Sequence, residues 1–406
     1  IAATSVATGS KININNINIL NDGRQDIVVF ENGNAPDFAN LDSFAAYTAD
    51  YSYTFKSDSA GILSTDLVKK NLKGFNAAIG DEDNETRSYT LSDGQNVFDD
   101  LGELKGGENA VLTLNGNGNT LNGTKDDGTS SYAGMTTVRN QKVTIDNVAS
   151  VENFASENGG FIKSSGELNI SNSSFKNNSA VENGGAVWSD NIVNVSATNG
   201  NNVEFSGNTA NGVSNAIYMA DATSSLNLIA DGGNIVFNDG IDGVNGYTVN
   251  ISGTDQNSVS FNQSVSNVGN ININSSHVYL DRTDRLNGAN ITLNGGNLHF
   301  DNGVINNGIA FGKLTGGNGT LHIDVDTLNQ TADQIAVQEL TGTVNVVAYN
   351  IGGPDNGAFD KTGASILFAR VTEPGNGKFR VLRVENSAYE WLTDSNVLNN
   401  GSTEWL

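Results

Sequence analysis

Residues that could do chemistry are sparse in this chain. It has no cysteine, which excludes thiol catalysis, and no Gly-Asp-Ser-Gly turn, which speaks against a serine nucleophile. Of the three histidines, His277, His299 and His322, the second alternates with Leu298 and Phe300 in a short apolar run. It should therefore point outward, and we interpret all three as ordinary surface histidines. The sequence predicts no catalytic residue, no metal ligand and no cofactor.

The densest charge cluster of the repeat region combines two acids and two bases, namely Asp281, Arg282, Asp284 and Arg285. Its guanidinium groups can hold a glycan through bidentate hydrogen bonds. The cluster can also be a solvated corner loop with internal ion pairs, which is the interpretation we favour. Two acidic segments, residues 80–85 and 125–128, lack the spacing of calcium-binding loops, so we interpret them as exposed acidic loops.

Aromatic side chains concentrate outside the repeats, at Tyr47, Tyr51, Tyr53 and Phe55. The alternation of the last three predicts a strand with one aromatic face. Aromatic loops on a rigid scaffold are common recognition surfaces, and packing of this segment against the rest of the chain explains them equally well. Trp188 is either an exposed platform for a sugar or a groove-packed side chain. Together with the charge cluster, these residues form the candidate binding surface.

The charge balance narrows the range of partners. The chain has 406 residues, with 21 Lys and Arg against 45 Asp and Glu, and a formal net charge of -24. We expect no nucleic-acid partner, because that affinity rests on basic side chains, and binding to anionic membrane surfaces is disfavoured for the same reason. No segment approaches the ~18 continuous apolar residues of a membrane helix. The lack of cysteine suits a bacterial protein that crosses the periplasm unfolded.

Short apolar–polar–apolar triplets recur along most of the chain and predict half-buried strands. Leu168–Ile170 is followed after about 25 residues by Val193–Val195, and Ile271–Ile273 after about 20 residues by Ile291–Leu293. A hairpin meander would place strands about every 8–12 residues without this longer register. The spacing therefore predicts an all-β, right-handed parallel β-helix, in which equivalent strands stack from coil to coil.

A second repeat supports the same fold. Phe175–Asn178 and Phe205–Asn208 share a Phe-x-x-Asn pattern, and Gly184-Gly185-Ala186 follows the first copy. Phe can fill the interior and stack on the Phe of the next coil. Asn tolerates a left-handed corner and bonds its own turn, and the glycine pair permits a turn in which a side chain would clash.

The rhythm of triplets divides the chain into four regions. We predict opening strands with a first strand over 11–17, then an irregular insertion, the repeat region, and a C-terminal cap with longer strands such as 344–349 and 365–369. Within the insertion, residues 38–45 have helical spacing, and 63–79 can hold another helix or an irregular loop. The predicted bounds are 1–31 for the opening strands, 32–106 for the insertion, 107–312 for the β-helix repeats and 313–406 for the cap.

Two sets of motifs resemble known families. The Phe-x-x-Asn and Gly-Gly-Ala elements between Phe154 and Ile217 resemble those of polymorphic outer membrane proteins, which are autotransporters. The C-terminal segment resembles the pertactin-like, autochaperone end of autotransporter passengers. Its motifs are Leu314–Val325, Ala332–Val337, Thr341–Val346, Ile366–Phe368, Gly377–Phe379 and Ser387–Leu392.

The resemblance implies a passenger of Gram-negative type V secretion, displayed on the cell surface or released from it. It also implies that a β-barrel outside this sequence anchors the passenger in the outer membrane. We expect a virulence-associated adhesin and no enzyme, binding a host cell-surface protein, a glycan or another copy of itself in cell aggregation. The alternative is a carbohydrate-active β-helix enzyme, a lyase or hydrolase, which needs two carboxylates about 5–10 Å apart with a shifted pKa.

Overall fold

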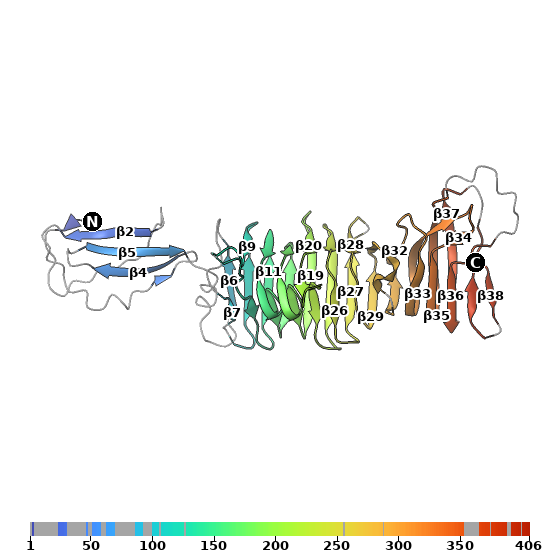
Figure 1. The fold of residues 1–406 in the computed structure, drawn as a ribbon, viewed down its shortest axis with the longest axis horizontal. Coiled ribbons are helices and arrows are strands. Elements are labelled where there is room, and N and C mark those ends of the chain that lie inside the picture. Colours follow the sequence, from blue (N-terminus) through green and yellow to red (C-terminus); the bar gives the residue numbers. More distant parts are fainter. Residues whose placement is uncertain are drawn as a thin grey trace.

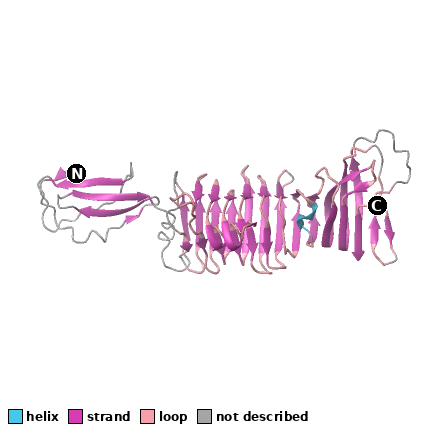
Figure 2. Ribbon diagram, viewed as in Figure 1, coloured by secondary structure: helices cyan, strands magenta, loops and turns pink. Residues whose placement is uncertain are grey.

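The computed structural model is an all-β protein in which short strands stack in parallel along the long axis (Figures 1 and 2). It describes residues 2–3, 23–30, 46–47, 51–57, 62–69, 86–91, 100–104, 107–125, 127–254, 256–286, 288–352, 365–373, 375–387, 391–398 and 400–406. Within these ranges the one helical element is the 3-10 helix η2 (Thr283–Leu286). The predicted parallel β-helix is confirmed.

Each full coil contributes strands to three columns, in which every strand pairs in parallel with its counterpart in the next coil. The first column contains β6 (Thr86–Thr90), β8 (Val111–Asn115), β11 (Lys142–Asp146), β15 (Glu167–Ser171), β19 (Ile192–Thr198), β24 (Ser225–Asp231), β27 (Thr248–Gly253), β29 (Asn270–Asn274) and β31 (Asn290–Asn294). The second column contains β9 (Thr120–Asn122), β12 (Ser150–Glu152), β16 (Phe175–Lys176), β20 (Val203–Ser206), β25 (Ile235–Phe237), β28 (Ser258–Phe261), β30 (His277–Leu280) and β32 (Asn297–His299).

The third column forms a separate sheet on another side of the coil. It contains β7 (Gly102–Glu103), β10 (Met135–Thr136), β14 (Ile162–Ser164), β18 (Val187–Ser189), β23 (Ile217–Met219) and β26 (Ile241–Gly243). A small fourth sheet contains β13 (Ala155–Asn158), β17 (Ser179–Asn183), β21 (Thr209–Ala210) and β22 (Val213–Ser214). Three columns per coil explain why the triplets recur at less than half of the coil length.

The interior of the coils holds a continuous apolar core. Apolar residues of the triplets, such as Leu168 and Ile170, are almost fully buried, whereas the residue between them is half-buried on the outer face. Stacked phenylalanines run through the core, with ring centroids 5.1 Å apart for Phe175 and Phe205 and 4.8 Å apart for Phe205 and Phe237. The predicted stacking of phenylalanine from coil to coil is therefore confirmed.

The roles predicted for the asparagine of the Phe-x-x-Asn motif are corrected, because its side chain bonds the neighbouring coils and not its own turn. Asn178 and Asn208 are fully buried, and the side-chain amide of Asn178 donates to Oδ1 of Asn208 over 2.9 Å. Asn208 in turn donates to Asp239 over 2.7 Å. The left-handed backbone instead belongs to the preceding residues, Asn177 with φ 54° and Gly207 with φ 73°. Each Phe-x-x-Asn motif thus ties one coil to the next through its asparagine.

The glycine pair occupies a turn without room for side chains, as predicted. Gly184 has φ 67°, and a Cβ atom there would lie 2.1 Å from the carbonyl oxygen of Val187. A Cβ atom on Gly185 would lie 2.4 Å from the amide nitrogen of Thr209. Both distances are far below van der Waals contact, so only glycine fits this turn.

The N-terminal strands differ from the predicted arrangement. A five-stranded sheet contains β1 (Ala2–Ala3), β2 (Gly23–Phe30), β5 (Ile62–Lys69), β4 (Tyr51–Ser57) and β3 (Ala46–Tyr47). Because β2 pairs antiparallel with β5, residues 1–31 and 32–106 are not separate units. The start of the predicted helix or loop over 63–79 is a strand. The predicted strand over 11–17 and the helix over 38–45 lie outside the described residues.

The predicted boundaries of the repeat region are also revised. The strand β6 pairs in parallel with β8, so the coils begin before residue 107. At the other end, β33 (Asn307–Asp326) pairs with both β31 and β32 and continues the stack into β35 (Gln334–Asn350). The remaining strands are β34 (Thr331–Ala332), β36 (Ala369–Glu373), β37 (Lys378–Glu385), β38 (Ser395–Val397) and β39 (Thr403–Trp405). Residues 344–349 are extended as predicted, whereas the strand expected over 365–369 begins only at Ala369.

Candidate binding surface

The outer face of the first column carries a continuous row of asparagines, which we call the asparagine ladder. Each is the third residue of its strand and is half-buried, and the strand register places them directly above one another. From Asn194 onward, each side-chain amide donates to the Oδ1 atom of the asparagine in the preceding coil, over distances of 2.8, 2.7, 2.8 and 2.8 Å. The members of the ladder are Asn169, Asn194, Asn227, Asn250 and Asn272.

The ladder continues as a row of hydroxyl groups. Asn272 is in register with Thr292 on β31, which is in register with Thr315 on β33. Thr315 and Thr341 share a hydrogen bond of 3.0 Å. Because a carboxamide has two N–H donors and a ladder bond uses one of them, the second donor can serve a ligand. The row therefore repeats donors and acceptors at the coil spacing of about 4.8 Å.

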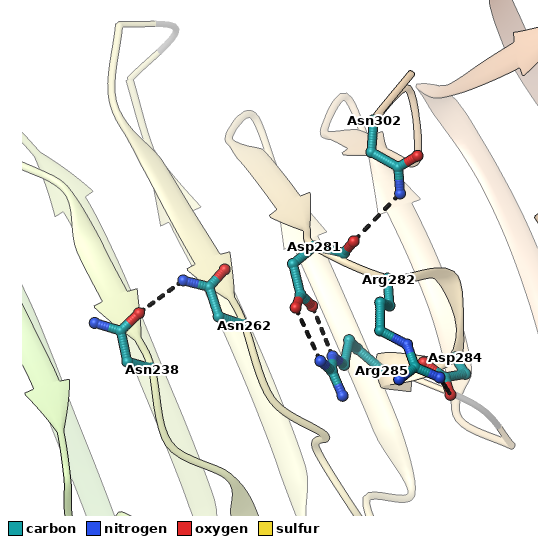
Figure 3. Close-up of polar contacts among 7 residues, drawn as sticks. All are labelled: Asn238, Asn262, Asp281, Arg282, Asp284, Arg285 and Asn302. Carbon is teal, nitrogen blue, oxygen red and sulfur yellow. Dashed lines mark hydrogen bonds and ion pairs between the residues drawn. The ribbon is translucent and has the colours of Figure 1, made fainter. Parts of the chain in front are cut away.

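A shorter polar row lies on the second column. The side-chain amide of Asn262 donates to Asn238 over 2.7 Å, and that of Asn238 donates to Glu204 over 2.9 Å (Figure 3 shows the first of these bonds). The amide of Asn302 donates to the backbone carbonyl of Asp281 over 3.3 Å, which connects the loop after β32 to the predicted charge cluster.

The charge cluster is a loop with internal ion pairs, as we favoured. Arg285 donates two hydrogen bonds to the carboxylate of Asp281, over 2.6 and 2.8 Å, and Arg282 lies 2.9 Å from Asp284 (Figure 3). Hydrogen bonding to Asp281 raises the pKa of Arg285. Three of these four residues lie in or directly beside η2, which brings the chain around a corner. The guanidinium of Arg285 is thus bonded within its own loop, and the side chain of Arg282 is the more exposed of the two.

Trp188 lies half-buried on β18, on the outer face of the third column. The ammonium of Lys163 on β14 lies 5.0 Å from the centre of its ring. The register aligns Lys163, Trp188 and Tyr218 in one outward-facing row, and Tyr218 was not among the predicted residues. Alignment of the triplets Ile162–Ser164, Val187–Ser189 and Ile217–Met219 would have revealed it.

The remaining aromatic candidates belong to the N-terminal sheet. Tyr51, Tyr53 and Phe55 lie in β4, which confirms the predicted strand, and Tyr47 ends β3. The orientation of their side chains lies outside the described part of the structure. The described strands of this sheet pair among themselves and with no strand of the coils.

His299 is not an ordinary surface residue, contrary to the prediction, whereas His277 and His322 are half-buried on the outer face. His299 is only 7% exposed, although it alternates with the core residues Leu298 and Phe300. Its ring stacks on His322 with centroids 4.0 Å apart and on Tyr279 with centroids 4.2 Å apart. Parallel stacking brings the outward side chains of successive coils into contact. A ring in the middle of such a row is therefore buried by the rings on either side of it.

Hydrogen bonds fix both ring nitrogens of His299. Its Nε2 atom lies 2.8 Å from Nδ1 of His277, and its Nδ1 atom lies 3.0 Å from Oδ1 of Asp301. Burial and the neighbouring His299 lower the pKa of His322 from 6.5 to about 4, so this ring is neutral at pH 7. Within the described ranges, His299, Asp301 and His322 are the residues grouped closely enough to hold a metal ion.

A pair of buried carboxylates lies near this group. Asp324 and Asp333 are both fully buried, and burial raises the pKa of Asp333 from 3.8 to about 7 and that of Asp324 in the same direction. Asp333 accepts the backbone N–H groups of Asn306 and Asp324, over 2.7 and 2.8 Å. Asp324 accepts that of Gly303 over 2.6 Å. These carboxylates therefore hold the loop between β32 and β33.

A scan against protein-family models and a search of the curated proteins find no match for this chain. Among the described residues, no helix has the length and apolar character needed to cross a membrane.

Proposed function

We propose that this chain is the surface-displayed passenger of a Gram-negative autotransporter and acts as an adhesin. It binds a glycan, a host cell-surface protein or another copy of itself through the outer faces of its coils. The observation that carries the proposal is the asparagine ladder, a straight row of polar groups on a rigid scaffold. The Phe-x-x-Asn motifs and the pertactin-like C-terminal motifs support the assignment to autotransporters.

The ladder suits a repetitive ligand. Its side chains are held in place by their own hydrogen bonds, so that little conformational entropy is lost when they bind. A polysaccharide or a second rod presents hydroxyl or amide groups at several points along its length. Many weak contacts along one row then add up through effective concentration, without any single strong site.

A carbohydrate-active enzyme is the second candidate, and the raised pKa of Asp333 is the observation in its favour. A general acid near pH 7 needs such a pKa. Both carboxylates of this pair, however, are enclosed and already accept backbone N–H groups. The same geometry serves to hold a loop, so binding remains the better supported function.

The test is a glycan-array and cell-binding screen of the full chain, with light scattering for self-association. The double variant Asn227→Ala, Asn250→Ala removes the centre of the ladder. A matched control, Asn158→Ala with Asn183→Ala, removes a hydrogen-bonded pair from the small fourth sheet. We expect the ladder variant to lose binding or association and the control to retain it. Equal binding by both, or shortening of a bound polysaccharide, would refute the proposal.

A further inference from the structure

All three histidines of the chain gather on the outer face of the second column, near the point where β33 continues the stack. His277 lies on β30, His299 on β32 and His322 on β33, and the register pairs the last two directly. Asp301 follows two residues after His299 and reaches the same side. Figure 1 shows β32 and β33 side by side in neighbouring coils.

We infer that His299, Asp301 and His322 form a binding site for a divalent transition-metal ion such as Zn²⁺. The inference is independent of the proposed adhesin function. One ligand atom from each of the three residues lies within 4.8 Å of the others. Two imidazoles and one carboxylate are a ligand set suited to zinc, copper, nickel or iron, and unsuited to the hard ions calcium and magnesium.

The distances require only local adjustment. Ligand atoms about 2.0–2.1 Å from a tetrahedral zinc are separated by roughly 3.4 Å. The present separation of up to 4.8 Å closes by rotation of the side chains of Asp301 and His322, both less buried than His299. The metal would replace the proton between Nδ1 of His299 and Oδ1 of Asp301, which are 3.0 Å apart. Solvent would complete the coordination on the exposed side.

Outer contacts orient both rings for this task. Nε2 of His299 lies 2.8 Å from Nδ1 of His277, and Nε2 of His322 lies 3.3 Å from Oδ1 of Asn297. If each Nε2 donates to these acceptors, the Nδ1 atoms of both rings are left deprotonated as ligands. Metal-bound histidines nearly always donate their other N–H group in this way. His277 and Asn297 are therefore positioning residues.

The surrounding charge favours a cation. The chain carries a net charge of -24, and Asp301 and Asp324 are close enough to influence each other's ionisation. Arg383 on β37 is a cation that acts on His322, and Val347 on β35 lies between the two in the strand register. Its charge opposes that of the metal only in part, since it also bears an ion pair with Glu385.

The experiment is a calorimetric titration of the full chain with ZnCl₂, in excess Mg²⁺ so that exposed carboxylates are already occupied. We expect one Zn²⁺ per chain. His322→Asn and Asp301→Asn should each weaken binding at least about tenfold, because each removes a ligand. Asp284→Asn, in the nearby charge cluster, should leave it unchanged. Equal affinity in all four proteins would overturn the inference.

X-ray absorption of the Zn²⁺-loaded wild-type chain gives a readout that needs no variant. Coordination by this site predicts scattering from two imidazole rings together with oxygen ligands. Scattering from oxygen alone would place the ion on surface carboxylates and would equally overturn the inference. Because the chain contains no cysteine and three histidines, imidazole scattering can come from this cluster alone.

Discussion

At the scale of the residue, the stacking of coils decides whether an outward-facing side chain is exposed or buried. Alternation correctly predicts that His299 points away from the core, and yet this residue is buried, because Tyr279 and His322 from adjacent coils cover it. A sequence read one strand at a time contains no information about which residues lie above and below. The glycine turns, in contrast, were predictable, since their requirement is local to the backbone.

The glycine turns give a matched pair of substitutions. Gly184→Ala should destabilise the fold by about 3 kcal/mol or more, because it combines a left-handed backbone with a Cβ atom 2.1 Å from a carbonyl oxygen. Gly118→Ala should cost only about 1 kcal/mol, because its φ of 75° is similar but no atom lies within 4 Å. Urea unfolding followed by circular dichroism measures both. Equal losses would mean that the backbone angle alone decides.

The asparagines buried inside the coils should contribute more to the stability of the fold than those on the outer faces. Asn208→Ala removes the side-chain acceptor of the buried backbone N–H of Asn178 and one of the donors to Asp239. Loss of such a bond in the interior costs roughly 1–3 kcal/mol. Asn262→Ala removes a single half-exposed bond on the outer face and should cost about 1 kcal/mol or less. The urea midpoints of the two variants compare these costs directly. A larger loss for the outer variant would contradict the proposed role of the buried asparagines.

At the scale of the element, the triplets predicted the strands of the coils because their period of two is set by burial on one face. The long strands at the C-terminal end were only partly predictable. Gly316, Gly317 and Gly319 suggest a turn, but they lie within β33, where its register with β35 shifts. Glycine in a strand marks such a bulge, and the amino-acid sequence alone does not distinguish the bulge from a turn. The pairing of β2 with β5 depends on contacts distant in sequence, which no periodicity reveals.

The loop between β32 and β33 makes stability depend on pH through Asp333. Its pKa is about 7 in the folded chain against 3.8 in the unfolded chain, so folding takes up a proton between these values. The contribution is therefore fully present below pH 3.8 and is lost as the pH rises toward 7, by about 4 kcal/mol in total. Asp333→Asn should reduce the difference between the unfolding free energies measured at pH 5 and at pH 8. An unchanged slope in this variant would show that Asp333 is ionised throughout.

At the scale of the whole molecule, the coils form a quasi-one-dimensional stack, in which each coil contacts mainly its neighbours. The N-terminal sheet shares no described strand pairing with that stack. The overall architecture was predictable from the spacing of about 20–25 residues, since each coil must place its apolar residues over those of the last. The proposed binding face was not predictable in the same way, because the asparagine ladder becomes visible only when the register is known.

Removal of the N-terminal sheet should leave the stack folded. A chain that begins at Thr86 retains β6 and every strand pair of the coils. We expect its β-type circular dichroism and its cooperative unfolding to persist, with a free energy of unfolding within about 1 kcal/mol of that of the full chain. Loss of the cooperative transition would show that the N-terminal sheet is part of the structural core.

The central claim, that the asparagine ladder is the binding face, can be tested by site-specific protection. Because the chain has no cysteine, single substitutions introduce unique reactive thiols. Asn227→Cys places one within the ladder, and Asn158→Cys places one on the fourth sheet. Thiol labelling rates are measured with and without the bound glycan, or at low and high protein concentration. The ladder position should become protected while the other remains reactive, and protection at Asn158→Cys alone would contradict the claim.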